Sequence, residues 1–172
     1  SGSATLSPES ASLETGSQVP ELLFQADFTD ESAAYLGLEE NTATFSLSDI
    51  KADMLVLQVM SMYCPFCQQE APTVNELKTL LDGRDEHIVI LAVAAGNSQF
   101  EAEIFQNKYE VGFPVLPDQD FILHRQLGSV GTPFFYVFGL SPDGASVLLA
   151  KLGRMESAQA FLDEILSLQP NP

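Results

Sequence analysis

The sequence contains no tryptophan, only two cysteines and only seven basic residues in 172. Set against 24 acidic residues, this shortage of Lys and Arg gives a formal net charge of −17. Such a charge repels phosphate backbones and anionic lipid surfaces, so we do not expect nucleic acid as a partner. The acids are scattered along the chain, which favours a role in solubility over the steering of a basic partner protein.

Long hydrophobic runs are also missing. No stretch approaches the roughly 18 apolar residues that a membrane span requires, so we expect no span within this sequence. The hydrophobic fraction of 45% instead indicates one globular domain with a full core. Residues 1–18 are rich in Ser, Gly, Thr and Ala and are predicted to be a flexible tail or linker, whose opening Ser-Gly-Ser resembles an expression scar. The domain is expected at 19–169, with a short tail at 170–172.

Three continuous apolar runs predict strands buried on both faces of a sheet, at residues 54–60, 88–95 and 134–138. Helices are predicted over 65–83, with Gly83 as the stop and Pro72 as a kink, over 98–112, over 120–128 and over 156–168. Ser98 and Glu101 have the spacing of a capping box. The order of elements indicates an α/β sandwich with a mixed sheet.

Shorter strands complete the predicted pattern. Residues 113–116 are predicted to form a short strand, and 146–153 are predicted to pair with 134–138 as a hairpin. Before the first buried strand, 19–28 and 42–50 are predicted to hold two short strands around an acidic excursion at 29–41. These two strands are expected to cover an edge of the main sheet.

Both cysteines lie in the stretch "CPFC", where the first buried strand turns into a helix. This places Cys64 at the helix N-terminus, where free amides and the helix dipole favour a thiolate. Cys67 follows one helical turn later and can resolve a mixed disulfide, while Pro65 suits the first helical position. The pair therefore has the arrangement of a redox catalyst.

Three other interpretations of the cysteines stand beside this one. A zinc site needs four ligands, and the remaining candidates, His87 and His124, lie in separate segments without metal spacing and are interpreted as surface or edge residues. A structural disulfide closing so short a loop removes little unfolded-state entropy. Two inert buried thiols are the third alternative.

With these residues in hand, the chain resembles the thioredoxin-fold thiol-disulfide oxidoreductases of the TlpA/ResA (redoxin) type over roughly residues 19–168. "CPFCQQEAP" matches the family pattern Cys-x-x-Cys-x-x-Glu-x-Pro, residues 112–133 resemble the family's αβ insertion, and "VGTPFFYVF" matches its Gly-x-Pro loop. The resemblance implies a thioredoxin-like three-layer sandwich with a mixed central sheet, an N-terminal β extension and this insertion. It also implies that Pro133 is cis and that the backbone of Thr132 pairs with an incoming peptide.

The chain departs from the family at several positions. Gln58 stands where thioredoxins have a buried aspartate, which leaves Glu70 as the nearest proton acceptor for Cys67; the alternative is that Glu70 is a solvent-facing helix residue. Met60 and Tyr63 replace the usual tryptophans. With Phe66 they could form an apolar docking surface, although Met60 also suits core packing.

The resemblance predicts a disulfide reductase that acts on exported proteins. Cys64, Cys67 and Glu70 would be catalytic, Thr132, Pro133, Tyr63, Phe66 and Pro65 would bind substrate, and the redox-active Cys64–Cys67 disulfide would be the only cofactor. Partners would be protein thiols and disulfides and an upstream electron donor, such as a membrane thiol-disulfide transporter. We expect a periplasmic location or an anchor on the outer face of the cytoplasmic membrane.

Two alternatives remain open at this point. A peroxiredoxin-like peroxidase needs a Pro-x-x-x-Thr-x-x-Cys pocket, and here Ser61 could replace the threonine but Leu57 stands in place of the proline. A binding or chaperone-like module would keep the thioredoxin groove and use its cysteines only structurally.

Overall fold

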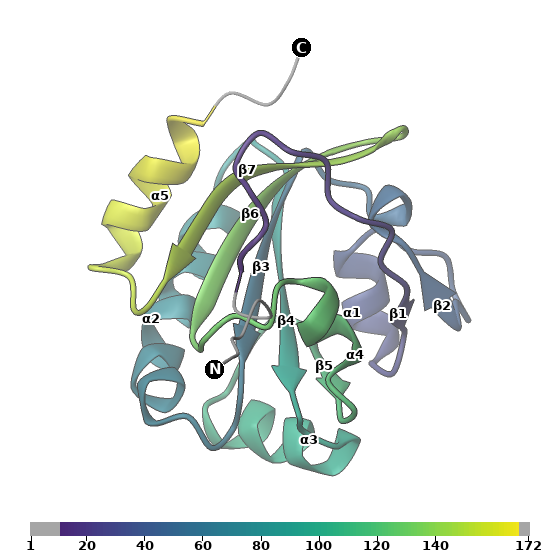
Figure 1. Ribbon diagram of the computed structural model, residues 1–172, viewed down its shortest axis with the longest axis vertical. Coiled ribbons are helices and arrows are strands. Elements are labelled where there is room, and N and C mark those ends of the chain that lie inside the picture. Colours follow the sequence, from purple (N-terminus) through teal and green to yellow (C-terminus); the bar gives the residue numbers. More distant parts are fainter. Residues whose placement is uncertain (1–10, 169–172) are drawn as a thin grey trace, which may run out of the picture.

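The computed structural model describes residues 11–168. The predicted tail at 170–172 and the first ten residues of the predicted linker lie outside the described residues. A five-stranded sheet forms the centre, in the order β5-β4-β3-β6-β7 (Figure 1). Its strands are β3 (Met54–Met60), β4 (Ile88–Ala95), β5 (Val115–Asp118), β6 (Phe134–Ser141) and β7 (Gly144–Leu152).

The sheet is mixed, as the sequence predicted. β3 and β4 run parallel, as do β4 and β5, whereas β6 is antiparallel to both β3 and β7. Every residue of β3 and β4 is buried, because layers of structure cover both faces of the sheet. The three buried runs therefore lie where expected, with β6 extending three residues further than its apolar run.

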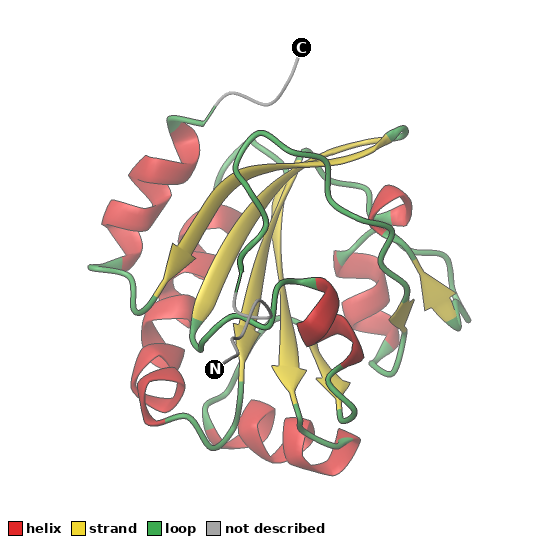
Figure 2. Ribbon diagram, viewed as in Figure 1, coloured by secondary structure: helices red, strands yellow, loops and turns green. Residues whose placement is uncertain are grey.

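Side chains of β3 alternate between two cores. Val56 and Met60 join a core with helices α2 (Pro65–Asp82), α3 (Gln99–Lys108) and α5 (Ala158–Leu166). Leu55 and Leu57 join the core on the other face, which the N-terminal segments and α4 (Ile122–Gln126) cover. Figure 2 shows helices on both sides of the sheet. The three-layer thioredoxin-like sandwich is thus confirmed.

The N-terminal β extension consists of β1 (Phe24–Gln25) paired antiparallel with β2 (Thr44–Phe45), followed by a 3-10 turn, η2 (Leu47–Asp49). The expectation that these strands cover a sheet edge is wrong, since Phe24 and Phe45 pack into the core on one face. The edge is covered instead by α1 (Asp30–Tyr35), which forms within the acidic excursion. The hydroxyl of Tyr35 accepts a 2.8 Å hydrogen bond from the backbone N–H of Ile90. Ile90 lies in the part of β4 that precedes its pairing with β5.

Residues 13–18, which the composition assigned to the linker, pack along the domain. The N–H of Gly16 donates to the carbonyl of Val147 at 2.8 Å, and the N–H of Val147 donates to Ser17 at 2.9 Å. The N–H of Leu13 donates to the hydroxyl of Tyr136 at 3.0 Å. The free edge of β7 therefore gains a backbone partner, and the folded domain begins before residue 19.

The helix boundaries follow the local signals in the sequence. Gly83 is the C-terminal cap of α2, and the helix continues through Pro72. Ser98 and Glu101 form a complete capping box at α3, because each side chain accepts from the backbone N–H of the other. The parallel direction of β3, β4 and β5 carries their C-terminal ends to one end of the molecule, the lower end in Figure 1.

Candidate active site

The two cysteines lie where β3 ends and α2 begins. Cys64 is the N-terminal cap of α2, and its sulfur accepts a hydrogen bond from the backbone N–H of Cys67 at 3.2 Å. Pro65 occupies the first turn, where its missing N–H costs no helical hydrogen bond. Cys64 is partly exposed and Cys67 is buried, and both are free thiols. The outer sulfur can thus meet a substrate while the inner one is shielded from solvent.

The surroundings of the two sulfurs shift their pKa values in opposite directions. Partial burial acts to raise the pKa of Cys64, but hydrogen bonds with the side chains of Cys67 and Thr132 and with the backbone outweigh it and lower the pKa overall. Burial, reinforced by the neighbouring Cys64, raises the pKa of Cys67 to about 12. Cys64 is therefore the sulfur that becomes a thiolate first.

This difference predicts selective alkylation of the reduced protein. We expect iodoacetamide to modify Cys64 alone near neutral pH, with a rate that reaches half of its maximum at a lower pH than for an ordinary thiol. Mass spectrometry of tryptic peptides across a pH series would measure both sites. Equal modification of Cys64 and Cys67 at neutral pH would contradict the assignment of the nucleophile.

The loop before β6 lies against the outer cysteine. The peptide bond between Thr132 and Pro133 is cis, and the thiol of Cys64 donates to the carbonyl oxygen of Thr132 at 3.5 Å. β6 is antiparallel to β3, with Phe134 paired to Val59. This pairing brings two segments about 70 residues apart in sequence to one place.

A residue that the sequence did not single out holds the loop before the nucleophile. Asn97 is buried at the end of β4. Its Oδ1 accepts from the N–H of Met62 at 2.8 Å, and its Nδ2 donates to Ser61 at 3.4 Å. Parallel strands end at the same edge of a sheet, so a polar residue just after the second buried run was the available signal.

Glu70 is fully buried, so its interpretation as a solvent-facing helix residue is wrong. One carboxylate oxygen accepts from Nε of Arg154 at 3.1 Å, and the other accepts from the N–H of Met155 at 2.7 Å. The described residues show no hydrogen bond between Glu70 and Cys67. Glu70 therefore ties α2 to the segment between β7 and α5, and its role as proton acceptor for Cys67 remains a prediction.

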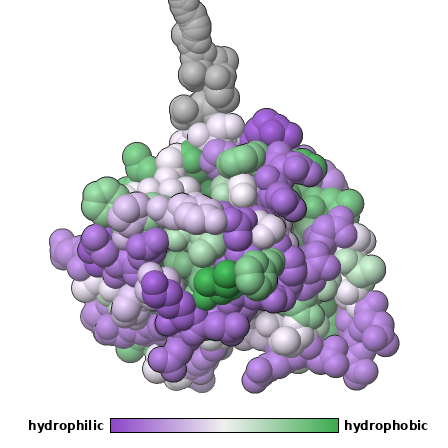
Figure 3. Space-filling model, turned by 90° about the horizontal axis from the view of Figure 1, so that it is seen from below, coloured by the Kyte–Doolittle hydropathy of each residue, from purple (hydrophilic) through white to green (hydrophobic). Residues whose placement is uncertain are grey.

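The predicted docking surface is present only in part. Tyr63 and Phe66 are 65% and 59% exposed beside Cys64, whereas Met60 is fully buried and belongs to the core. Leu152 is also exposed, and its Cδ1 would lie 3.2 Å from a Cβ placed on Gly131. Figure 3 views this end of the molecule and shows hydrophobic side chains surrounded by hydrophilic ones.

The two histidines lie away from the sulfurs. His87 is exposed in the turn before β4. The ring Nε2 of His124 lies 2.7 Å from the carbonyl oxygen of Val130, so it links α4 to the loop that leads to Thr132. Within residues 11–168, no group of three or more His, Cys, Asp or Glu side chains is placed to hold a metal ion.

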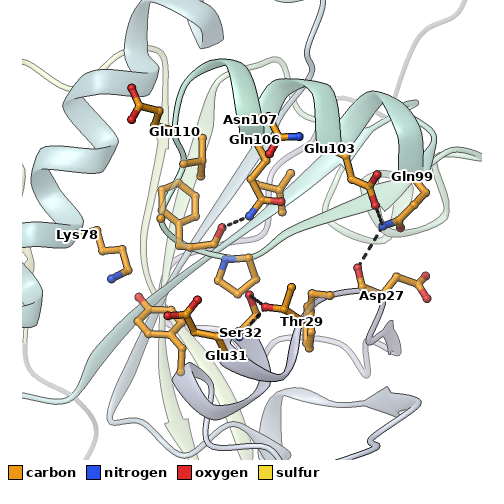
Figure 4. A pocket seen from close by; sticks show the side chains of 17 residues that line it. Asp27, Thr29, Glu31, Ser32, Lys78, Gln99, Glu103, Gln106, Asn107 and Glu110 are labelled. Atoms are coloured by element: carbon orange, nitrogen blue, oxygen red, sulfur yellow. Dashed lines mark hydrogen bonds between the residues drawn. The ribbon is translucent and has the colours of Figure 1, made fainter.

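A broad polar groove of about 980 Å³ lies elsewhere, between α1, α3 and the start of β5. Figure 4 shows Gln99 at one end, where it donates to Glu103 at 2.8 Å and to the carbonyl of Asp27 at 3.4 Å. None of the predicted site residues lines this groove. The contacts of Gln99 tie α3 to the N-terminal segment and hold the carboxylate of Glu103 at this groove.

The profile of the AhpC/TSA family matches residues 17–159, which span the cysteine pair, the cis-proline loop and most of the core. The chain belongs to the AhpC/TSA family. Among curated relatives, the thiol-disulfide oxidoreductase ResA of Bacillus anthracis is 24% identical over 141 residues, covering 77% of this chain and 74% of the relative. ResA of Halalkalibacterium halodurans is 22% identical over 138 residues, covering 74% and 70%.

Solved structures share the fold. The thioredoxin domain of a thiol-disulfide oxidoreductase from Bacteroides vulgatus aligns with a TM-score of 0.66 at 16% identity, covering 91% of this chain and all of that domain. A secreted disulfide oxidoreductase of Mycobacterium tuberculosis, homologous to E. coli DsbE, aligns with a TM-score of 0.59 at 20% identity, covering 81% and 100%. The resemblance to thioredoxin-fold oxidoreductases of the TlpA/ResA type is thus confirmed.

Membership of the AhpC/TSA family, with ResA as a recurring relative, makes the chain a redox protein of the thiol-disulfide oxidoreductase class. None of the helices within the described residues is long and apolar enough to cross a membrane.

Proposed function

We propose that this AhpC/TSA family member is a protein-disulfide reductase that works through the Cys64–Cys67 dithiol. The observation that carries the proposal is the contrast between the two sulfurs. Cys64 is accessible, caps a helix and has a lowered pKa, whereas Cys67 is buried one turn away with a raised pKa. An accessible nucleophile with a shielded resolving thiol is the arrangement that disulfide exchange requires.

The reaction begins when the Cys64 thiolate attacks one sulfur of a substrate disulfide. A mixed disulfide forms, and the other substrate sulfur leaves as a thiolate that takes a proton from water. Cys67 then loses its proton and attacks the Cys64 sulfur, which forms the intramolecular disulfide and releases the second substrate thiol. The substrate gains two electrons and the protein loses two, so an upstream thiol donor must reduce the Cys64–Cys67 disulfide for the next cycle.

Substrate would lie over the exposed side chains beside Cys64. The carbonyl of Thr132 already accepts a hydrogen bond from the Cys64 thiol, which supports a role for the Thr132–Pro133 backbone in aligning an extended peptide with the sulfur. Tyr63 and Phe66 offer exposed aromatic rings on the same surface, and Pro65 shapes the first turn between them. The reaction needs no metal or organic cofactor, since both electrons come from the dithiol.

Glu70 is proposed to assist deprotonation of Cys67 from within the same helix. Its carboxylate is buried one turn after Cys67, although both oxygens are bonded to Arg154 and Met155. Glu70→Gln removes the charge and keeps an oxygen acceptor. We expect this change to alter the pKa of Cys67 measured in a Cys64→Ser background, and an unchanged pKa would limit Glu70 to its structural contacts.

We also propose that this protein is exported and that its partners are in the same compartment. The support comes from relatives: this chain resembles ResA and DsbE homologues, and a matching disulfide oxidoreductase of Mycobacterium tuberculosis is secreted. On this proposal the protein acts in the periplasm or on the outer face of the cytoplasmic membrane. Its upstream donor would then be a membrane thiol-disulfide transporter.

The peroxidase alternative has less structural support. Leu57, at the position of the expected proline, is buried inside β3. The Ser61 hydroxyl, at the position of the expected threonine, accepts hydrogen bonds from the N–H of Tyr63 at 3.2 Å and from Asn97 at 3.4 Å.

An insulin-reduction assay tests the proposed function directly. With dithiothreitol as donor, we expect the protein to reduce insulin disulfides faster than dithiothreitol alone and to consume hydrogen peroxide no faster than free thiols do. Preferred consumption of peroxide would favour the peroxidase, and failure to oxidise either cysteine would favour the binding module.

A further inference from the structure

The residue just before the nucleophile is tied to a carboxylate. The hydroxyl of Tyr63 donates a hydrogen bond to Oε2 of Glu101, in the first turn of α3. The other oxygen of Glu101 accepts from the N–H of Ser98 at 2.8 Å and completes the capping box. The Glu101 side chain is therefore held by two partners beside the entrance to Cys64.

Hydrogen bonding keeps Glu101 anionic. The bond from Tyr63, with support from Ser98, lowers the pKa of Glu101, and the same bond raises the pKa of Tyr63. Tyr63 is 65% exposed, and the face of an aromatic ring attracts cations. A positive group that approaches Cys64 would thus meet a fixed carboxylate and an aromatic face together.

The positive charge of Arg154, on the other side of the Cys-Pro-Phe-Cys motif, is already paired with a carboxylate. Arg154 donates from Nε to the buried carboxylate of Glu70 at 3.1 Å and from its other nitrogens to Gln69. The chain as a whole carries a formal charge of −17, whose field draws cations towards its surface and repels anions. The charges around the site and the charge of the whole chain therefore both favour a positively charged substrate.

We propose that Glu101, held by Tyr63, selects disulfides that carry positive charge next to the reacting sulfur, so that the preferred protein substrates present Lys or Arg beside the cysteine. This inference rests on the proposed thiol-disulfide exchange at Cys64 and names the substrate class of that site. A small anionic disulfide would be a poor substrate for the same reason.

Three small disulfides of different charge test the inference. Cystamine is cationic, 2-hydroxyethyl disulfide is neutral and 3,3′-dithiodipropionate is anionic. Each oxidation rate of the reduced protein is divided by the rate of the same disulfide with 2-mercaptoethanol, which removes differences in intrinsic reactivity. At low ionic strength we expect the normalised rate for cystamine to exceed that for dithiodipropionate by about tenfold or more, and the preference to fall as salt is added.

Two variants on α3 separate local selection from overall charge. Glu101→Gln keeps the capping box, because Gln also serves at this position, and removes the charge beside Tyr63. Glu103→Gln removes one charge from the same helix, but Glu103 bonds to Gln99 at the polar groove (Figure 4). We expect Glu101→Gln to lower the cystamine preference about two- to fivefold, the range for an exposed ion pair. Glu103→Gln should leave the preference near that of the parent protein.

The outcomes distinguish this inference from the proposed function. Equal losses in both variants, or equal normalised rates for all three disulfides, would overturn the role of Glu101 while leaving thiol-disulfide exchange intact. Failure of every disulfide to oxidise the protein would overturn both. Circular dichroism of the two variants checks that α3 is retained.

Discussion

Replacing Cys67 with alanine is expected to convert the protein from a catalyst into a trap. Cys64 keeps its accessible sulfur and its place at the N-terminus of α2, so attack on a substrate disulfide continues. The resolving thiol is gone, and release of substrate depends on thiols from solution. Because a positioned intramolecular group can act at effective concentrations of about 10⁵ M or more, turnover should fall on the order of 10²-fold or more.

Non-reducing gels and mass spectrometry would measure the trapped mixed disulfide after incubation with insulin. Cys64→Ala is the matched control, since it leaves only the buried Cys67 and should trap nothing. Comparable mixed-disulfide formation by the two variants would mean that the sulfurs are not divided into nucleophile and resolving thiol.

Replacing Arg154 with alanine is expected to have the largest effect on stability. Glu70 is fully buried and would lose its charged partner. Removing one member of a buried ion pair costs about 3–5 kcal/mol. The Arg154 side chain is 42% exposed, so water can partly replace it and we expect a loss of about 2–3 kcal/mol in the free energy of unfolding.

Urea denaturation at neutral pH would measure this loss. Lys151→Ala is the matched control, because the Lys151–Glu164 pair has both partners partly exposed and should contribute no more than about 1 kcal/mol. A double-mutant cycle with Glu70→Gln isolates the coupling between the two side chains. If Arg154→Ala destabilised the protein no more than Lys151→Ala does, the proposed tie between α2 and the segment after β7 would be unimportant.

The sequence predicted the central sheet well because burial on both faces leaves a continuous apolar run. The strands at 54–60 and 88–95 lie where expected for this reason. The position of the cysteine pair could be predicted equally well, since a strand followed by Cys-Pro-x-Cys places one sulfur at a helix N-terminus. Local patterns determine these features.

Features that depend on distant partners were missed. Residues 13–18 have a linker composition, yet backbone pairing to β7 needs no apolar side chain. The burial of Glu70 depends on its partner Arg154, which lies 84 residues further on. The bond between Tyr63 and Glu101 likewise joins two segments that only the parallel pairing of β3 with β4 brings together.

The core-packing interpretation of Met60 is confirmed. Met60 and Tyr63 are close in sequence, but their surroundings differ. The strand ends at Met60, which points into the core, whereas Tyr63 lies in the loop and is exposed. The change from strand to loop between them decides which side chain a substrate can reach.

The measurement that tests the central claim most directly is the reduction potential of the Cys64–Cys67 couple, determined by equilibration in graded thiol buffers and counting of alkylated cysteines by mass. A protein-disulfide reductase must give its electrons readily to substrate disulfides, so its couple has to be strongly reducing. We therefore predict a potential near about −270 mV or lower, which is that of a reductase. A value near about −120 mV would indicate a disulfide-inserting oxidant, and the absence of any reversible disulfide would contradict the account altogether.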